Sequence, residues 1–386
     1  MNREKFTQGK RWVVKVGSSL VTNDGLGLDR MAIADWARQL VYLKSTGIQL
    51  VLVSSGAVAE GVSRLGLAER PREIHLQQAA AAVGQMGVIQ AYESCFMEHE
   101  VRAAQILLSH EDLSDRTRYL NARSTLQTLL ELGAMPVVNE NDTVATEELC
   151  FGDNDTLAAL VANLINADGM VILTDQEGLF TADPRVVADA RLIPSAAAND
   201  SSLVDMAGAG GSLGRGGMQS KLNAAKLAAR SGTDTVIARG RITDILMRLA
   251  QGEELGTHLY ADCEPMTARE QWLAGQLSLS GTLVLDAGAV EVLRHSGRSL
   301  LAVGIQSVSG SFLRGDVVSC HDRNGVEIAR GLVNYDAVEV ARLCGKNSGK
   351  IESLLGYVGE EEVIHRDNLI LIRQPKKNRP QAGLFL

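Results

Sequence analysis

A chain of 386 residues exceeds what one hydrophobic core usually organises, so its length predicts two domains. Hydrophobic residues make up 45% of the sequence and charged residues 22%, a balance typical of folded soluble proteins, and no apolar run is long enough to span a bilayer. The five scattered cysteines form no C-x-x-C pair, the net charge of −8 does not attract nucleic acid, and the N-terminus has no apolar secretory segment. We therefore expect a cytoplasmic protein with reduced thiols that binds neither a membrane nor nucleic acid.

The first strand is expected over 12–16, where valines and a tryptophan are interrupted by Lys15. A lysine is rarely buried without an anionic partner. Gly17 and two serines follow, and a glycine turn lets backbone N–H groups face an anion. These residues predict a phosphate site, although a lysine that merely extends from the sheet into water would show the same pattern.

A strand–helix–strand unit of a parallel sheet is expected next. The helix covers 28–46, with Asp29 as its N-cap and Gly47 at its end, and the second strand covers 49–53. This strand runs into Ser54-Ser55-Gly56-Ala57, a second small, polar turn. Because ligands of parallel sheets collect beyond the carboxyl ends of the strands, both turns are expected to line one site.

An Ala/Gln-rich helical segment that Pro71 breaks is expected over 61–90, a strand over 104–108 and a helix over 119–132. Two polar clusters follow these elements. They are Asn139 to Thr143, after a short strand at 136–138, and Phe151 to Asp155, before a helix over 156–165. Carboxylates and amides at a strand end can hold an ammonium group, orient a lysine or organise magnesium. Turn formation is the alternative, and Asp155 is expected to cap the helix in either case. Asp142 and Asn154 are the members expected to contact a ligand.

A glycine-rich loop over 208–217 follows the fifth strand, which covers 170–174. Its composition allows backbone to approach a polyphosphate, and the helix expected over 218–231 points its N-terminus at the same place. Lys221 lies in the first turn of that helix, where a positive charge opposes the helix dipole. We therefore expect the Lys221 ammonium group to pair with an anion.

The pattern changes after the strand at 235–238. From about Leu277, short alternating segments are separated by Gly and Asn-Gly turns, which predicts a small barrel of antiparallel strands. The expected fold class is therefore α/β, with a mostly parallel sheet sandwiched by helices and a small β-rich barrel after it. The predicted parts are an α/β domain over 1–262, a linker over 263–276, a β domain over 277–372 and a basic tail over 373–386.

Several segments in this order resemble the amino acid kinase family, in particular its glutamate-phosphorylating members with a C-terminal PUA domain. They are VVKVGSS, VLVSSGA, VNENDTVAT with FGDNDTLAA, LTDQEGLFTADPR and GGMQSK. The resemblance covers nearly the whole chain and implies the amino acid kinase fold followed by a PUA-like domain. The chain has no G-x-x-x-x-G-K-[ST] loop, and its first strand is not followed by G-x-G-x-x-G, so Walker-type NTPases and dinucleotide enzymes are disfavoured.

The resemblance implies ATP-dependent phosphorylation of the side-chain carboxylate of L-glutamate to L-glutamyl 5-phosphate, the first step of proline biosynthesis. Mg²⁺ would bridge the ATP phosphates, and no side chain is implied to bind the metal directly. Lys15 and Lys221 would flank the transferred phosphoryl group, and Asp153 would hold the two lysines.

The resemblance also implies which residues bind the two substrates. Ser55 and Asn154 would bind the carboxylates of glutamate through the hydroxyl and the amide, and Asp142 its ammonium group. One departure from the family is that Arg215 and Ser220 replace two threonines of the nucleotide loop. The implied nucleotide contacts are Lys15, Gly17, Thr174, Asp175, Gly214, Arg215, Gly216, Gly217, Met218, Gln219, Ser220 and Lys221.

Further implied partners are a second or further copies of the chain, as a dimer or tetramer, proline as a feedback inhibitor, and a glutamyl phosphate reductase. Two alternative functions stay open.

The first is a sibling kinase that acts on N-acetylglutamate, aspartate, carbamate or a nucleoside monophosphate. Asp142 argues against an acetylated amine, because it is a free ammonium group that needs a carboxylate partner. The PUA domain could add RNA binding, which the nearly balanced charges after Gln276 disfavour.

Overall fold

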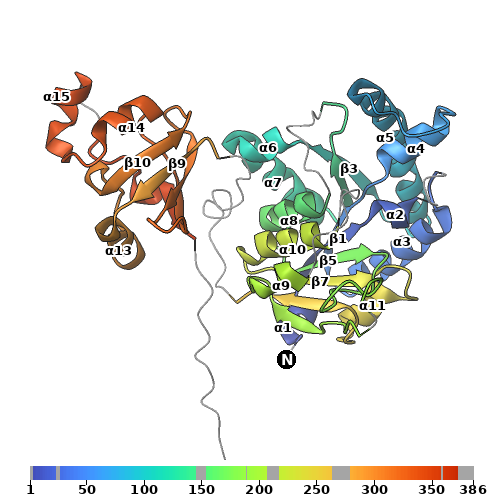
Figure 1. The fold of residues 1–386 in the computed structure, drawn as a ribbon. Coiled ribbons are helices and arrows are strands. Elements are labelled where there is room, and N and C mark those ends of the chain that lie inside the picture. The colour runs from blue at the N-terminus through green and yellow to red at the C-terminus, as the bar shows by residue number, and fades with distance from the viewer. Residues whose placement is uncertain are drawn as a thin grey trace, which may run out of the picture. The chain divides into compact units, whose positions relative to one another are not determined.

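The computed structural model describes residues 3–22, 27–144, 154–187, 189–206, 217–262, 279–357 and 360–372. The chain divides into two compact units, residues 1–268 and 269–386 (Figure 1). This division falls within the stretch predicted as a linker, although the linker itself lies outside the described residues. Two units agree with the expectation from chain length.

An eight-stranded sheet in the order β3-β4-β2-β1-β5-β7-β8-β6 forms the centre of the first unit. Its pairs are parallel except for β7 with β8, which confirms the predicted mostly parallel α/β class. The strands are β1 (Arg11–Val16), β2 (Gln49–Val53), β3 (Ala103–Leu108), β4 (Met135–Glu140), β5 (Gly169–Thr174), β6 (Ser195–Ala197), β7 (Asp234–Arg239) and β8 (Thr257–Tyr260).

Helices cover this sheet on both faces (Figure 1). The helix at 30–45 begins where it was predicted, because the Asp29 carboxylate accepts a hydrogen bond from the Ala32 N–H at 3.0 Å. The helices are α1 (Glu4–Thr7), α2 (Ser18–Val21), α3 (Arg30–Ser45), α4 (Ala57–Arg64), α5 (Ile74–Met97), α6 (His110–Ser114), α7 (Arg116–Glu131), α8 (Asn154–Ile165), α9 (Ser202–Met206), α10 (Met218–Ala229) and α11 (Ile245–Ala250).

Strand alternation decides which helices the central strand β1 meets. Trp12, Val14 and Val16 pack in one core cluster with α3, α5 and α11. Because successive side chains of a strand point to opposite faces, Val13 and Lys15 lie on the other face, where α8 packs against β1 and α10 packs against α8. Lys15 therefore lies on the face of β1 that α8 covers, and its side chain points toward α8 and α10.

Helices α4 and α5 form the helical segment predicted over 61–90, and the predicted break at Pro71 is confirmed. Pro71 lies in the connection between them, and the two helices pack unusually close together. A Cβ atom at Gly61 would lie 1.7 Å from the Ala80 carbonyl oxygen, and one at Gly84 would lie 1.9 Å from the Ala57 carbonyl oxygen. Glycine is required at both positions, and the close packing holds α5 against the α4 helix that follows β2.

The second unit has its own five-stranded sheet, in the order β10-β9-β11-β12-β13, and its own hydrophobic core. The prediction of a purely antiparallel barrel is wrong in one respect, because β9 pairs with β11 in parallel. Local alternation identifies strands but does not determine which distant strands pair. The elements are β9 (Gly281–Leu285), α13 (Ala287–Ser296), η1 (Ala302–Gly304), β10 (Ile305–Gly310), β11 (Val317–His321), β12 (Glu327–Leu332), α14 (Ala337–Leu343), η2 (Ser348–Lys350), α15 (Ile351–Leu355), η3 (Arg366–Asn368) and β13 (Leu369–Leu371).

A search of the described residues finds no helix with the length and apolar character that a bilayer span requires. The longest helix, α5, has 24 residues, but it belongs to the packed first unit.

Candidate active site

The carboxyl ends of the central strands meet at one edge of the first sheet. Lys15 of β1 is in register with Val53 of β2 and Ile172 of β5, so the turns after these three strands lie next to one another. The strands β2, β3 and β4, which follow β1 along the chain, lie on one side of it in the sheet, and the later strands β5 and β7 lie on the other side. Such a switch point, beyond the carboxyl ends of parallel strands, is where open α/β sheets bind their ligands.

A buried carboxylate joins the two predicted lysines at this edge. Lys15 Nζ lies 2.6 Å from Asp155 Oδ1, and Lys221 Nζ lies 2.9 Å from Asp155 Oδ2. The side chain of Asp155 is 0% exposed, and those of Lys15 and Lys221 are 5% and 7% exposed. Each lysine therefore has an anionic partner, which is a side chain of the protein itself, and the expected contact with phosphate stays a prediction.

Electrostatics make this cluster a receptor for negative charge. Burial by itself would raise the pKa of Asp155, but the ammonium groups of Lys15 and Lys221 outweigh it and hold that pKa below its ordinary value. Asp155 is therefore ionised at neutral pH. The three side chains place two ammonium groups and one carboxylate together in a buried part of the molecule, and buried positive charge of this kind attracts an anion.

The structure corrects one expectation for the acidic cluster before α8 and adds a contact that was not expected. Asp155 does not cap this helix, because α8 begins at Asn154 and Asp155 lies within its first turn. Its carboxylate instead makes the contacts with the two lysines that were expected of Asp153. Asp153 lies outside the described residues, so its role stays a prediction.

The turn after β1 also differs from expectation. The Gly17 N–H donates to the Leu173 carbonyl oxygen at 3.1 Å, so it extends the sheet and is not available to an anion. Its φ of −67° is one that any residue can adopt. A Cβ atom at Gly17 would lie 3.9 Å from Lys15 Nζ, so the glycine leaves space beside the ammonium group.

The N-terminus of α10 lies at the same cluster. Ser220 Oγ is 3.0 Å from Asp155 Oδ2 and 2.8 Å from the carbonyl oxygen of Gly217, the residue that precedes the helix. Serine therefore keeps the hydroxyl of the threonine that it replaces. Met218 is the first helical residue, and Gln219 Nε2 donates along the helix to Asn223 Oδ1 at 3.2 Å. The predicted contacts Gly214, Arg215 and Gly216 lie outside the described residues.

The remaining predicted nucleotide contacts lie at the end of β5. Thr174 is buried, and its hydroxyl donates to Asp175 Oδ1 at 3.0 Å. Asp175 is exposed just beyond the strand. Since β5 is the neighbour of β1, both residues lie on the same edge of the sheet as Lys15.

Two of the three predicted glutamate-binding residues contact each other. Asn154 Nδ2 lies 2.5 Å from the Ser54 carbonyl oxygen, 2.7 Å from Asn139 Oδ1 and 3.2 Å from Ser55 Oγ. An amide nitrogen has two hydrogens, so these protein acceptors use its donor capacity. In this arrangement the amide nitrogen of Asn154 is turned toward the protein, and its contact with a substrate carboxylate stays a prediction. The contacts with Ser54 and Asn139 are the two shortest and take the two hydrogens of Asn154, and the Ser55 hydroxyl lies beside them at 3.2 Å.

The third, Asp142, lies just after β4 and lines a cavity of about 230 Å³. The cavity is walled by α5, by the edge strand β3 and by the residues that follow β4, and its polar members include Gln85, Gln105 and Glu140. Most of the cavity wall is apolar, with residues such as Ala81, Met86 and Leu107, and a few polar groups in such a wall can orient a small ligand.

Family comparison decides how this edge of the sheet is to be interpreted. The model of the amino acid kinase family matches residues 10–239, more than half of the chain, and the PUA domain model matches residues 281–355. The chain belongs to the amino acid kinase family. Both lysines, Asp155 and the cavity beside Asp142 fall within the matched kinase segment.

Relatives of this amino acid kinase are similar along almost the whole chain. It is 62% identical over 366 residues to the glutamate 5-kinase of Nitrosospira multiformis, across 95% of this chain and 98% of that one. It is 60% identical over 371 residues to the glutamate 5-kinase of Stutzerimonas stutzeri, across 96% and 100%. A crystal structure of UMP kinase from Bacillus anthracis is 14% identical, with a TM-score of 0.47 over 67% of this chain and 99% of that one, a likeness too weak to bear on the substrate.

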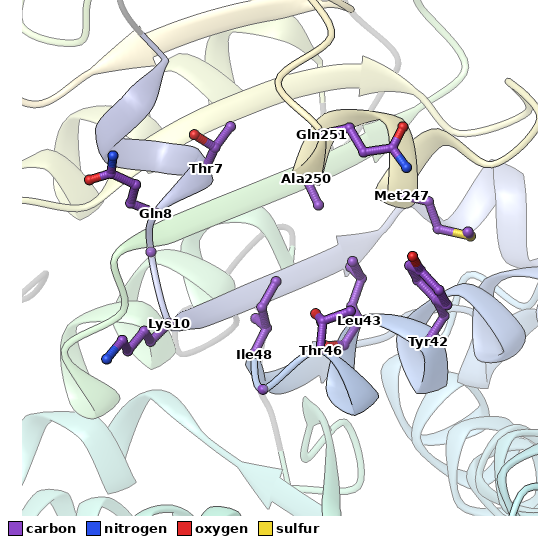
Figure 2. A pocket seen from close by; sticks show the side chains of 12 residues that line it. Thr7, Gln8, Lys10, Tyr42, Leu43, Thr46, Ile48, Met247, Ala250 and Gln251 are labelled. Carbon is purple, nitrogen blue, oxygen red and sulfur yellow. The ribbon is translucent and has the colours of Figure 1, made fainter.

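A larger cavity in the kinase unit, of about 570 Å³, lies at the other end of the strands. Lys10 and Ile48, which directly precede β1 and β2, line it together with the ends of α3 and α11. Figure 2 shows mostly neutral side chains around it, such as Leu43, Met247 and Gln251. This cavity is larger than the one beside Asp142, but it lies at the opposite end of the strands from the buried lysines.

The sequence did not reveal two members of the kinase site. The contacts of Asp155 had no distinguishing signal, because three consecutive residues, Asp153 to Asp155, can each provide a side chain there. The hydrogen bond between Gln85 and Asn139 had no distinguishing signal in the sequence either. A glutamine within an alanine-rich helix looks the same whether it is buried or exposed to solvent. In the part of the chain that is described, no group of three or more His, Cys, Asp or Glu side chains is arranged to hold a metal ion.

Proposed function

We propose that this chain is a glutamate 5-kinase, which uses ATP to phosphorylate the side-chain carboxylate of L-glutamate. The product is L-glutamyl 5-phosphate, the first intermediate of proline biosynthesis. Relatives with that activity in their names, about 60% identical over nearly the whole chain, support the reaction. The structural observation that carries the chemistry is the pair of buried lysines held by Asp155.

The reaction needs positioning and charge neutralisation, and little covalent chemistry from the protein. One oxygen of the glutamate side-chain carboxylate attacks the γ-phosphorus of ATP. A new P–O bond forms while the bond to the β,γ-bridging oxygen breaks, and ADP leaves with that electron pair. No general base is required, because a glutamate carboxylate with an ordinary pKa of about 4.3 is already ionised at pH 7.

Lys15 and Lys221 stabilise the negative charge on the phosphoryl group as it moves. Asp155 holds both ammonium groups before the substrates bind, so they need not reorganise during the reaction. The N-terminus of α10 adds the positive end of a helix dipole at the same place. Ser55, beyond β2, donates its hydroxyl to the reacting carboxylate.

ATP-dependent phosphoryl transfer generally uses Mg²⁺, which neutralises charge on the phosphate oxygens. The residues at the site fit an ion carried by ATP better than one held by the protein. Both oxygens of the buried carboxylate Asp155 are engaged by ammonium groups, so this residue offers no free oxygen ligand. We therefore assign the ion to the phosphates, with Asp175 as the exposed carboxylate beside them.

The decisive test is an ADP-release assay with four acceptors side by side: glutamate, aspartate, N-acetylglutamate and UMP. Glutamate is expected to give a kcat/KM at least about 100-fold above each of the others, since a site with a carboxylate for the ammonium group rejects an acetylated amine. A higher kcat/KM with any other acceptor would overturn the assignment. The names of the relatives disfavour the aspartate, N-acetylglutamate and carbamate alternatives.

Asp142→Asn is expected to raise the KM for glutamate at least tenfold and to leave the KM for ATP unchanged. Asp142 lines the cavity beside α5, which we assign to the acceptor, and loss of a charged hydrogen bond costs about 1.5–3 kcal/mol. Glu93→Gln, an exposed position on α5, provides the matched control. A raised KM for ATP together with an unchanged KM for glutamate would show that Asp142 contacts the nucleotide instead.

We also propose a cytoplasmic homo-oligomer, inhibited by proline and coupled to a reductase that consumes the acyl phosphate. The identity to glutamate 5-kinases along nearly the whole chain supports these assignments. Light scattering tests the oligomer, and a monomeric mass would contradict it. Glutamate saturation curves with added proline test the inhibition, and unchanged curves would contradict that part. Pull-down of the purified reductase tests a physical coupling.

A further inference from the structure

A line of three side-chain amides runs from β2 to helix α5. Asn154 Nδ2 donates to the Ser54 carbonyl oxygen and to Asn139 Oδ1, and Asn139 Nδ2 donates to Gln85 Oε1 at 2.6 Å. Asn139 is 1% exposed and Gln85 is 9% exposed. Such a buried line is constrained, because each amide has one donor end and one acceptor end.

The backbone carbonyl of Ser54 determines the direction of the whole line. A carbonyl can only accept, so Asn154 must turn its NH₂ group toward it. That nitrogen also faces Asn139, which must therefore present its oxygen to Asn154 and its nitrogen to Gln85. The last amide must then present its oxygen to Asn139, and its nitrogen is left over.

The remaining donor is the Nε2 group of Gln85. It is buried, and among the described residues it has no hydrogen-bond partner. A buried donor without a partner is unfavourable, so its position calls for an acceptor. Gln85 lines the same 230 Å³ cavity as Asp142, which contributes a carboxylate. The other polar residues of the cavity do not accept from this group. Glu140 is a second buried carboxylate there but is not a hydrogen-bond partner of Gln85 Nε2, Thr143 donates its hydroxyl to Asn141 Oδ1 at 2.5 Å, and Gln105 is exposed on the edge strand.

We propose that Gln85 is a substrate-binding residue whose amide N–H donates to the α-carboxylate of glutamate, while Asp142 accepts from the α-ammonium group. This inference rests on the proposed function. The two α-substituents share one carbon atom, so a ligand with its ammonium group at Asp142 places its α-carboxylate on a neighbouring part of the same cavity wall. Asn139 and Asn154 are positioning residues that keep the donor end of Gln85 toward the substrate.

Gln85→Glu is the sharpest test, because it keeps the oxygen that accepts from Asn139 and replaces the donor by a charged acceptor. The KM for glutamate is expected to rise at least tenfold, with the KM for ATP unchanged. If Gln85 only holds Asn139, the variant keeps that contact, and its glutamate KM stays within about threefold of wild type. That result would overturn the proposal.

A second measurement uses the 1-amide of glutamic acid, in which a carboxamide replaces the α-carboxylate. The wild-type enzyme is expected to prefer glutamate, whereas the Gln85→Glu side chain can accept from the amide NH₂ group. The ratio of kcat/KM for glutamate to that for the 1-amide should therefore fall at least tenfold in the variant. An unchanged ratio would overturn the proposal even if kcat/KM fell for both substrates.

Controls separate the possible failures. Gln90→Glu adds the same charge at an exposed position of α5 and is expected to leave both quantities unchanged. If Gln85→Glu does not fold, Gln85→Met decides, because a normal glutamate KM without any donor would contradict the assignment. A wild-type enzyme that releases no ADP with glutamate would overturn the proposed function itself. Normal wild-type turnover, together with an unchanged KM for glutamate in Gln85→Glu, would overturn only the role of Gln85.

Discussion

Replacing Lys15 or Lys221 by alanine is expected to lower glutamate-dependent ADP release at least about 100-fold. Each ammonium group is preorganised by Asp155, at 2.6 Å and 2.9 Å, and loss of one such charge partner for the transition state typically costs that much. The fold should persist, because the remaining lysine still neutralises the buried carboxylate. The measurement is kcat at saturating ATP and glutamate, after cooperative unfolding has been confirmed.

Lys10→Ala is the matched control, since Lys10 is exposed and lies at the opposite end of β1, beside the cavity in Figure 2. It should keep wild-type turnover. A folded Lys15→Ala or Lys221→Ala variant that retains more than about a tenth of the wild-type rate would show that the lysine concerned does not stabilise the phosphoryl group.

Asp155→Asn is expected to affect both activity and stability. The substitution leaves two buried ammonium groups without their shared counter-charge, and removing one partner of a buried ion pair costs roughly 3–5 kcal/mol of unfolding free energy. Turnover should fall at least about 100-fold, because neither lysine keeps its position. Urea denaturation at pH 7 and steady-state rates measure the two effects, with Glu93→Gln as the control for an exposed carboxylate.

The pH dependence of unfolding gives the Asp155→Asn prediction a second readout. In the folded protein the pKa of Asp155 is held below its ordinary value, because Lys15 and Lys221 outweigh the effect of burial. Its ionised form therefore contributes stability above the unfolded pKa of about 3.9, and this contribution is lost as the pH falls through the lower folded pKa. The asparagine variant lacks this contribution, so its stability should fall less steeply below about pH 4. Equal acid slopes for variant and wild type would contradict the ion-pair assignment.

Much of the fold could be predicted from local sequence, because buried strands and their glycine turns are local features. The strands β1, β2, β4 and β5 and the turns after them were predicted near their observed positions. Since parallel strands bring their carboxyl ends to one edge, the sequence also predicted that Lys15 and Ser55 lie at the same edge, which the strand register confirms. The parallel pairing of β9 with β11 escaped prediction, because alternation along one strand says nothing about its distant neighbour.

The sequence by itself therefore determined the family, the edge of the sheet that carries the site, and the two lysines that need an anion. Only the tertiary structure showed that Asp155 contacts both lysines, because the start of α8 at Asn154 places this side chain between them. It also decided that Asn154 turns its nitrogen inward, since the carbonyl that requires this belongs to Ser54, 100 residues earlier. Hydrogen-bond direction in a buried network is set by partners that are distant in sequence, and local patterns do not contain that information.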